Sequence, residues 1–301
     1  MKCWPALAPF GKRLSMKGGE IFYYDSAQDS GATRLPILAL IHGLGDEADT
    51  WRHVFPALAS EGFRVLAPDL PGFGRSAWKG HINLRVHAKA VIALLEKTLA
   101  DNPNGAPEIS LIGNSLGVGI AEMVACKRPD LAKRIILISS CFPIENRIIK
   151  KFWLLGLPFL GKKRYRDLRN NHKAAQKSLY PYYADFDGME NADKEFLRER
   201  VIERIESANQ ERGQISTVRS MNHFFLYGSR LVGRAIKKYP GKIYIIFGDK
   251  DIVYPLAKTA LFRGMRKDAE FTLVTDAGHL PQQEKPEALV AQILRALRAG
   301  D

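Results

Sequence analysis

Short apolar runs alternate with longer helical patterns along most of this chain, and this alternation limits its fold more than any other feature. We predict strands at residues 20–25, 36–41, 63–67, 108–112, 134–139, 242–247 and 270–274. Most of these runs lack polar alternation, which is typical of strands buried on both faces of a parallel sheet. Helical patterns cover residues 83–99, 116–127 and 286–298. Together they predict an α/β fold with a mostly parallel central sheet flanked by helices.

The alternation stops after Cys141 and returns near residue 241. The intervening segment is mostly helical in pattern and rich in charged residues. We therefore predict a core formed by residues 1–141 and 241–301, with residues 142–240 inserted as a helical cap. Ligands of open α/β sheets bind at the carboxyl ends of the strands, so an insertion at a strand end is a candidate lid.

Composition and charge narrow the class of protein. The chain has 301 residues, 46% of them hydrophobic and 26% charged, which is typical of a globular protein. Its three cysteines are odd in number and form no C-x-x-C pair, so neither a disulfide framework nor a zinc site is expected, and no cofactor is predicted. The net charge of +13 is compatible with nucleic acid, a membrane surface or an acidic substrate. Without a zinc-finger, RRM or long basic motif, we expect no nucleic-acid partner.

The sequence also bears on location. No apolar run approaches the roughly 20 residues needed to cross a bilayer. The apolar patch near the N-terminus is interrupted by Pro5 and Pro9, which makes it a poor signal peptide. We therefore expect a cytoplasmic protein, with peripheral membrane contact as an additional hypothesis.

The motif Gly113-Asn114-Ser115-Leu116-Gly117 lies between a predicted strand and a predicted helix. This context is the one required of G-x-S-x-G, the nucleophile elbow. A serine on so sharp a turn adopts a strained backbone conformation that projects its hydroxyl, and the helix that follows directs its N-terminal amides toward developing negative charge. By itself this short motif is weak evidence for a catalytic serine, so the assignment depends on whether a base and an acid accompany it.

A reactive serine needs a general base, and the base needs an acid that orients it. Candidates for both follow late strands: Asp249 and Asp251 after residues 242–247, and His279 after residues 270–274. The order Ser, Asp, His is that of α/β-hydrolases and differs from the orders of two common serine-protease folds.

With these motifs, the chain resembles the α/β-hydrolase superfamily, in its lid-bearing esterase and lipase-like branch. The resemblance covers residues 15–141 and 241–299. Its further motifs are His42-Gly43-Leu44-Gly45-Asp46 followed by Trp51, Pro68-Asp69-Leu70-Pro71-Gly72-Phe73-Gly74-Arg75-Ser76, Gly248-Asp249-Lys250-Asp251-Ile252-Val253, and Gly278-His279-Leu280-Pro281 ahead of Glu284. It implies an α/β-hydrolase fold with the cap inserted after the sixth strand.

The resemblance assigns roles to matching positions. Ser115 matches the nucleophile, His279 the base and Asp251 the acid, since the family places this acid at the fourth position of G-x-x-D. Asp249 is then a turn residue. The backbone N–H groups of Leu44 and Leu116 match the oxyanion hole. The implied activity is that of a serine hydrolase acting through an acyl-enzyme on a hydrophobic carboxylic ester, a small molecule with lipids among the candidates.

Other functions of the same fold stay open. Carbon–carbon bond hydrolases of the meta-cleavage type share the triad and often an Asn where Asn114 stands, but they usually carry Trp where this chain has Leu280. A ligand receptor that has lost catalysis is a third alternative. Epoxide hydrolases and haloalkane dehalogenases normally use Asp at the elbow, so Ser115 argues against both. We interpret His42 as structural.

The cap sequence carries an unusual charge distribution. Residues 147–177 contain ten basic residues and one acidic residue around the apolar run 152–160. An apolar patch flanked by cations suggests peripheral contact with an anionic membrane. The simpler interpretation is an acyl pocket lined by the apolar residues, with solvated cations outside it. Residues 185–211 hold nine acidic and four basic residues and could neutralise the basic stretch.

Overall fold

The computed structural model describes residues 1–27, 35–101, 108–142, 154–224 and 229–299. Its centre is a nine-stranded sheet in the order β1-β2-β4-β3-β6-β7-β8-β9, with β5 paired to β2. The strands are β1 (Gly11–Met16), β2 (Gly19–Asp25), β3 (Ile37–Ile41), β4 (Arg64–Pro68), β5 (Ala77–Trp78), β6 (Ile109–Asn114), β7 (Ala132–Ile138), β8 (Lys242–Gly248) and β9 (Glu270–Val274). The pairs from β4 across to β9 are parallel, while those made by β2 are antiparallel. The predicted α/β-hydrolase fold, with its mostly parallel sheet, is confirmed.

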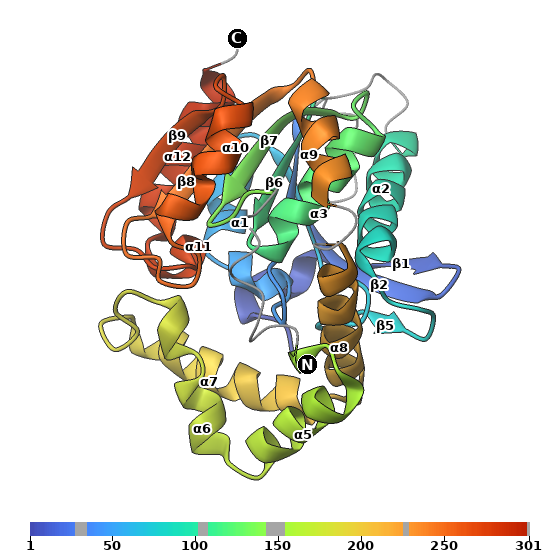
Figure 1. Ribbon diagram of the computed structural model, residues 1–301, viewed down its shortest axis with the longest axis vertical. Helices are drawn as coiled ribbons and strands as arrows, with labels where there is room; N and C mark the ends of the chain where they lie inside the picture. Colours follow the sequence, from blue (N-terminus) through green and yellow to red (C-terminus); the bar gives the residue numbers. More distant parts are fainter. Residues whose placement is uncertain (28–34, 102–107, 143–153, 225–228, 300–301) are drawn as a thin grey trace.

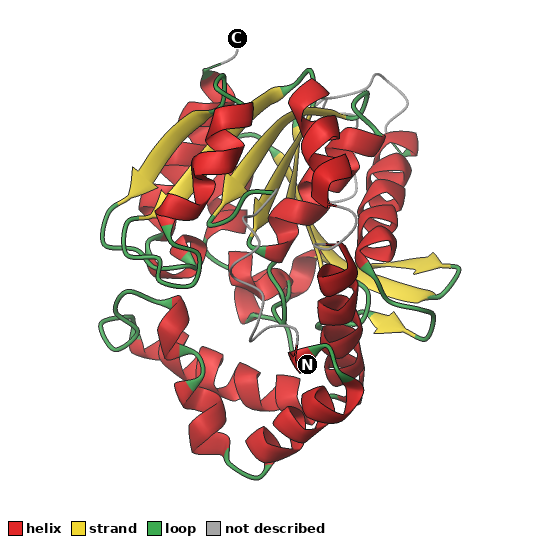
Figure 2. Ribbon diagram, in the orientation of Figure 1, coloured by secondary structure: helices red, strands yellow, loops and turns green. Residues whose placement is uncertain are grey.

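Helices cover both faces of this sheet (Figures 1 and 2). The α-helices of the described residues, in the core and in the cap, are α1 (Val54–Ser60), α2 (Leu84–Ala100), α3 (Leu116–Lys127), α5 (Pro158–Arg169), α6 (His172–Lys177), α7 (Asn191–Glu206), α8 (Ala208–His223), α9 (Ser229–Lys238), α10 (Ala260–Met265), α11 (Pro281–Glu284) and α12 (Pro286–Arg298). One apolar cluster joins the sheet to α2 and α3, and a second joins its other face to α1 and α12. Alternate residues of β3 enter the two clusters, because side chains alternate along a strand.

The helices from α5 to α8 lie beyond the carboxyl ends of the parallel strands, at the lower end of Figure 1. The chain leaves the sheet for this region after β7, which is the sixth strand along the main path of the sheet when two-residue β5 is left out. Helix α9 differs from its neighbours in the insertion. It packs against α3, and its Ile236 belongs to the apolar cluster of the sheet. Helix α9 thus lies beside the core although it precedes residue 240. The limit of the cap at residue 240 stays a prediction.

Two strands are absent from the sequence prediction. Strand β1 alternates between exposed and half-buried residues, so neither of its faces carries the buried apolar pattern that reveals a strand. Strand β5 has two residues, too few for any periodicity. None of the helices that the structure describes combines the length and apolar character needed to cross a bilayer.

Candidate active site

Ser115 stands at the sharp turn between β6 and α3, with φ 54° and ψ −114°. A positive φ is costly for a residue with a Cβ and persists only where its surroundings enforce it. Part of that enforcement is the parallel pairing of β6 with β7, because the Ser115 N–H donates to the carbonyl of Ile138 at 3.0 Å. The strained serine that the motif predicts is therefore present.

Close backbone packing explains the two glycines of the motif. A Cβ on Gly117 would lie 2.1 Å from the carbonyl oxygen of Ile41, and one on Gly113 would lie 2.4 Å from that of Gly117. Neither position has room for a side chain, so the spacing G-x-S-x-G records how closely α3 approaches β3 and β6.

His279 and Asp251 form a buried pair at the same edge of the sheet. The imidazole Nδ1 lies 2.8 Å from Asp251 Oδ2, and both residues are less than one-tenth exposed. A carboxylate only accepts, so Nδ1 carries the hydrogen and Nε2 remains the acceptor. Asp251 Oδ1 accepts from the backbone N–H groups of Val253 and Tyr254, each at 2.9 Å, which holds the carboxylate toward the imidazole.

The two candidate acids thus differ in position. Asp249 directs Oδ1 to the backbone N–H of Ala277 at 3.3 Å, as expected of a turn residue. The structure therefore joins Asp251, and not Asp249, to His279.

Asn114 connects the elbow to the histidine loop. Its side chain is fully buried, and Nδ2 donates to the carbonyl of His279 at 3.1 Å. The loop after β3 approaches the same point, because a Cβ on Gly43 would lie 3.4 Å from the Cβ of Ser115. Three segments therefore converge: the elbow, the loop after β9 that carries His279 (the histidine loop), and the loop of residues 42–46 after β3 (the glycine loop).

His42 holds the glycine loop, which carries the candidate oxyanion donor Leu44. The Nε2 atom of His42 accepts from the Leu70 N–H at 2.9 Å, so Nδ1 carries the hydrogen and donates to the Gly43 carbonyl at 2.8 Å. Burial lowers the pKa of His42, which keeps the ring neutral in this arrangement. Leu44 follows in the turn, and Leu116 is the first residue of α3, where backbone amides have no acceptor within the helix.

The cap holds the glycine loop from its other side through Gln210 of α8. Its buried side chain donates from Nε2 to the Gly45 carbonyl at 2.8 Å and accepts from the Gly74 N–H at 3.0 Å. Gly45 has φ 77°, a conformation that side-chain-bearing residues rarely adopt. One amide thus bridges two core loops, one of which carries Leu44.

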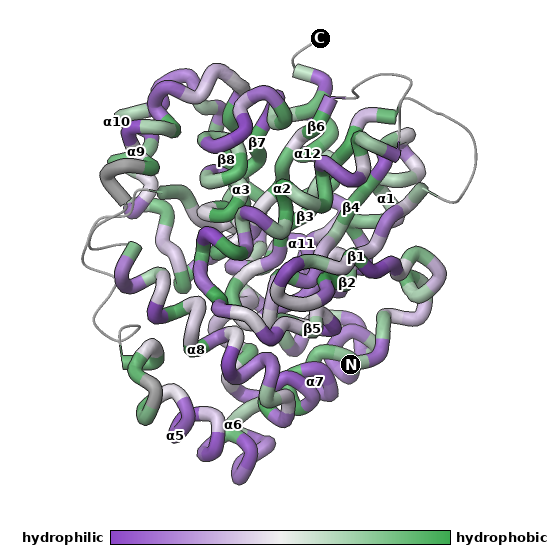
Figure 3. The backbone as a smooth tube through the Cα atoms, turned by 90° about the vertical axis from the view of Figure 1, so that its right-hand side faces the viewer, coloured by the Kyte–Doolittle hydropathy of each residue, from purple (hydrophilic) through white to green (hydrophobic). Residues whose placement is uncertain are grey.

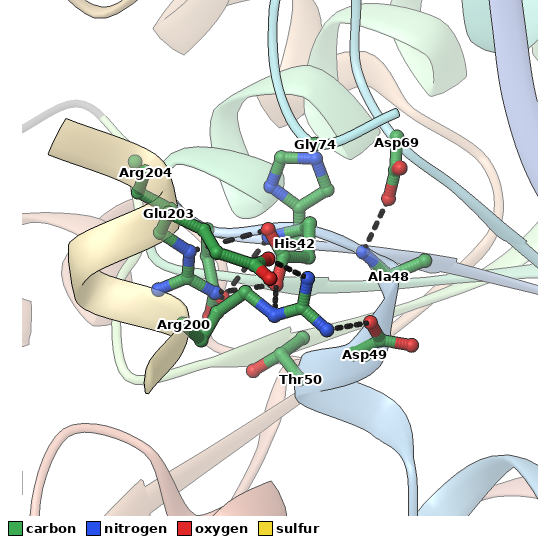
Figure 4. Close-up of polar contacts among 12 residues, drawn as sticks. His42, Ala48, Asp49, Thr50, Asp69, Gly74, Arg200, Glu203 and Arg204 are labelled. Carbon is green, nitrogen blue, oxygen red and sulfur yellow. Dashed lines mark hydrogen bonds and ion pairs between the residues drawn. The ribbon is translucent and has the colours of Figure 1, made fainter. Parts of the chain in front are cut away.

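Arginines of α7 add an ion-pair network at the same loop (Figure 4). Arg204 pairs with Asp46 and, at 3.0 Å, with Glu47. Arg200 pairs with Glu47 at 2.9 Å and with Asp49 at 3.2 Å. All of these acids are buried, so removing one partner would leave an uncompensated charge, which is strongly destabilising.

The cap also touches the histidine loop directly. The His279 N–H donates to the carbonyl of Tyr182 at 2.8 Å, and the two rings lie 6.0 Å apart. A Cβ on Gly278 would lie 2.7 Å from the backbone of Tyr183, which shows how closely the cap approaches. Sequence reasoning missed these contacts, and local patterns carry no signal for them because the partners are far apart in the chain.

Burial raises the pKa of two acidic groups in the core, Glu122 and Cys141. Glu122 lies on α3, and burial raises its pKa well above the usual range. Burial likewise raises the pKa of Cys141 to about 12. At 1.5 Å per residue, Glu122 is about 10 Å along α3 from Ser115, so an ionised form would oppose negative charge developing there. The raised pKa favours the protonated form of Glu122, which would remove that opposition, and the buried thiol of Cys141 is a packing group.

A nucleophile elbow at the carboxyl edge of a mostly parallel sheet is the arrangement that characterises hydrolases of the α/β class. The chain belongs to the alpha/beta hydrolase family, whose model matches residues 38–292. It is accordingly a hydrolase of this family, with lipases and esterases among the proteins it is similar to.

Three similar proteins illustrate the range of that family. Lipase 3 of Moraxella sp. (strain TA144) is 25% identical over 294 residues, covering 91% of this chain and 80% of its own. The 2-hydroxymuconate semialdehyde hydrolase of Pseudomonas sp. (strain CF600) is 28% identical over 278 residues, which cover 85% of this chain and 84% of the hydrolase. The solved structure of a thermophilic esterase from Thermogutta terrifontis superposes with a TM-score of 0.73 at 21% identity, covering 96% of this chain and 98% of the esterase chain.

Proposed function

We propose that this protein is a serine hydrolase that cleaves a hydrophobic carboxylic ester through an acyl-enzyme intermediate. The observation that carries the proposal is the strained Ser115 at the elbow, joined through Asn114 to a loop on which His279 is paired with Asp251. Residues held in such strained conformations cluster at active sites, and here the strain coincides with the nucleophile motif.

We propose the two-step mechanism of a Ser-His-Asp triad for this site. Ser115 Oγ attacks the ester carbonyl while His279 Nε2 accepts the serine proton, and Asp251 stabilises the resulting imidazolium. The backbone N–H groups of Leu44 and Leu116 donate to the oxyanion. His279 then protonates the departing alcohol, which leaves an acyl group on Ser115. Water activated by the same imidazole releases the carboxylic acid in a second addition and elimination.

Support for an ester substrate comes from chemistry and from similar proteins. An imidazole paired with a carboxylate can activate a hydroxyl, and the product of that attack on a carboxylic ester is an acyl-enzyme. Lipase 3 and Lipase 1 match most of this chain, and their names favour an apolar ester.

Carbon–carbon bond hydrolysis is the alternative, favoured by the similarity to 2-hydroxymuconate semialdehyde hydrolase. Two features weigh against it. Asn114 is buried and its amide nitrogen donates to the His279 carbonyl, a contact by which it supports the elbow. Leu280, where the meta-cleavage enzymes carry Trp, packs with the apolar cap residues around Tyr183 and Phe186.

The proposal is tested by labelling the purified protein with a fluorophosphonate and then assaying p-nitrophenyl esters of increasing acyl length beside a meta-cleavage diketone acid. We expect labelling and ester turnover. Turnover of the diketone acid alone would favour the carbon–carbon alternative. Binding of these compounds without any turnover or labelling would favour a receptor.

Removing the Gln210 side chain should weaken catalysis without removing a reacting group. We expect Gln210→Ala to lower kcat by about tenfold to 100-fold with little change in KM, because a loosened Gly45 displaces the Leu44 N–H from the oxyanion. Steady-state kinetics on a p-nitrophenyl ester measure both constants.

Asn209→Ala is the matched control for this variant. Asn209 is the adjacent residue of α8 and donates to the Ser76 carbonyl at 2.9 Å, so it also ties the cap to the core but does not reach the glycine loop. We expect it to retain near-normal kcat. Equal losses of kcat in both variants, each with a lowered Tm, would mean that Gln210 acts through general docking of α8.

A further inference from the structure

The tip of the cap exposes a cluster of large apolar side chains, which we call the tip patch: Leu154, Leu157, Phe159 and Leu160. Phe159 is 87% exposed and each of the leucines is 41% exposed or more. Figure 3 shows this hydrophobic stretch at the start of α5, followed by a hydrophilic one. Single exposed apolar residues are ordinary, but a contiguous apolar group on a surface marks an interaction site.

Helix geometry separates the two faces of α5. Gly161 and Tyr165 are buried, and a Cβ on Gly161 would lie 2.7 Å from Ile215 of α8. Phe159, Lys163 and Arg166 share the opposite face, because residues spaced four and seven apart in a helix align. The aromatic ring and the two cations therefore point outward together.

The charge around the tip patch is positive. Lys162, Lys163, Arg164 and Arg166 are all exposed and follow the patch directly. Within the described part of α5, Asp167 is the acidic residue among them, and it pairs with Lys163 at 2.9 Å. Residues 147–153 of the segment singled out by the sequence, with Arg147, Lys150, Lys151, Phe152 and Trp153, lie outside the described residues.

The acidic segment of the cap neutralises only the far end of this surface. Arg169 pairs with Glu211 at 2.6 Å, and His172 lies 3.6 Å from Glu206. Among the described residues, the ion pairs of the acidic segment reach Arg169 and His172 but not the cations that flank the tip patch. The excess positive charge therefore remains beside the apolar residues.

We propose that the tip patch and its cations dock on an anionic phospholipid surface. Phe159 and the leucines enter the boundary between head groups and acyl chains, while Lys162, Lys163, Arg164 and Arg166 contact lipid phosphates. Charge complementarity favours this occupant: an apolar contact alone would suit a protein partner equally well, but exposed cations follow the tip patch directly along α5. Helix α5 lies at the end of the cap far from the sheet, so docking leaves the core outside the membrane (Figure 1).

Sedimentation with vesicles tests this surface. The full chain is mixed with phosphatidylcholine vesicles that contain an equal share of phosphatidylglycerol, and separately with phosphatidylcholine alone. We expect pelleting with the anionic vesicles at low salt and less pelleting as salt is added, since screening weakens contacts with phosphates. Lys162→Gln with Arg166→Gln should lower the partition coefficient by about tenfold or more.

Matched variants separate the tip patch from the general positive charge. Lys89→Gln with Lys267→Gln removes the same charge from exposed positions on the core and should bind nearly as well as the unmodified chain. Phe159→Ser should weaken binding at both low and high salt, because the apolar contribution is not screened. Equal losses in the tip and core variants, or no pelleting at low salt, would overturn the proposal.

The binding measurement does not depend on turnover. Hydrolysis of a dissolved short-chain ester is assayed on the same preparations and should be unchanged in the tip variants. An inactive protein that still pellets would contradict the proposed esterase activity and leave the docking surface intact. An active protein that fails to pellet would contradict the docking surface and leave the proposed esterase activity intact.

Discussion

Replacing Ser115 by alanine is expected to lower kcat for ester hydrolysis by roughly 10³–10⁶-fold while the protein remains folded. The nucleophile and its base act as a unit, so loss of the hydroxyl removes the acyl-enzyme route entirely and leaves only binding and oxyanion contacts. The substitution deletes one oxygen from a partly buried side chain, and alanine carries the same Cβ into the strained turn. Steady-state kinetics with a p-nitrophenyl ester, beside circular dichroism and Tm, measure the effect.

Ser139→Ala provides a control of similar kind. Ser139 also has a positive φ, 56°, follows the neighbouring strand β7 and is fully buried, but it belongs to no motif. We expect this variant to keep most of its activity. Retention of ester hydrolysis by a clean preparation of Ser115→Ala would reject the nucleophile assignment and with it the acyl-enzyme mechanism.

Local patterns in the sequence predict the core well. The helices predicted at residues 116–127 and 286–298 match α3 and α12 at both ends, and each of the seven predicted strands has a counterpart in the sheet. These elements carry buried faces with a regular period, which is a property of neighbouring residues and therefore visible in one sequence. Strand β1 is not predicted because none of its residues is buried, so it has no buried face with a regular period.

The surroundings of the site are harder to predict, because they depend on contacts between distant segments. Gln210 looks like any polar helix residue until its 165-residue separation from Gly45 closes to a 2.8 Å hydrogen bond. Arg200 and Arg204 belong to the acidic segment 185–211, whose composition suggests a partner for the basic stretch of the cap, yet they form buried pairs with the loop after β3. Such contacts follow from how the cap docks, which no local period encodes.

The choice between Asp249 and Asp251 also depends on contacts that local sequence patterns do not encode. Two acids two residues apart both follow β8, and from the residues alone either could orient the histidine. The resemblance to α/β-hydrolases favours the later one, and the hydrogen bonds of the turn explain why: Oδ1 of Asp251 is held by the N–H groups of Val253 and Tyr254, which leaves Oδ2 for His279.

Asp251→Asn should therefore lower kcat by roughly 10⁴-fold. The carbonyl oxygen of the introduced side-chain amide can keep the two backbone hydrogen bonds now made by Oδ1, and its NH₂ group then occupies the place of Oδ2. A donor facing Nδ1 forces the imidazole into the other tautomer, with the hydrogen on Nε2, where it can no longer accept the serine proton. The kcat of this variant and the pH profile of its kcat/KM measure the loss.

Asp249→Asn is the decisive comparison, because it makes the same chemical change two residues away. Asp249 Oδ1 accepts from the Ala277 N–H at 3.3 Å, a contact that an asparagine oxygen can also make, so the turn and the position of His279 should persist. We expect a kcat close to that of the unmodified protein. The opposite ranking of the two variants would transfer the orienting role to Asp249 and would require the histidine loop to rearrange during catalysis, since the 2.8 Å contact of His279 is with Asp251.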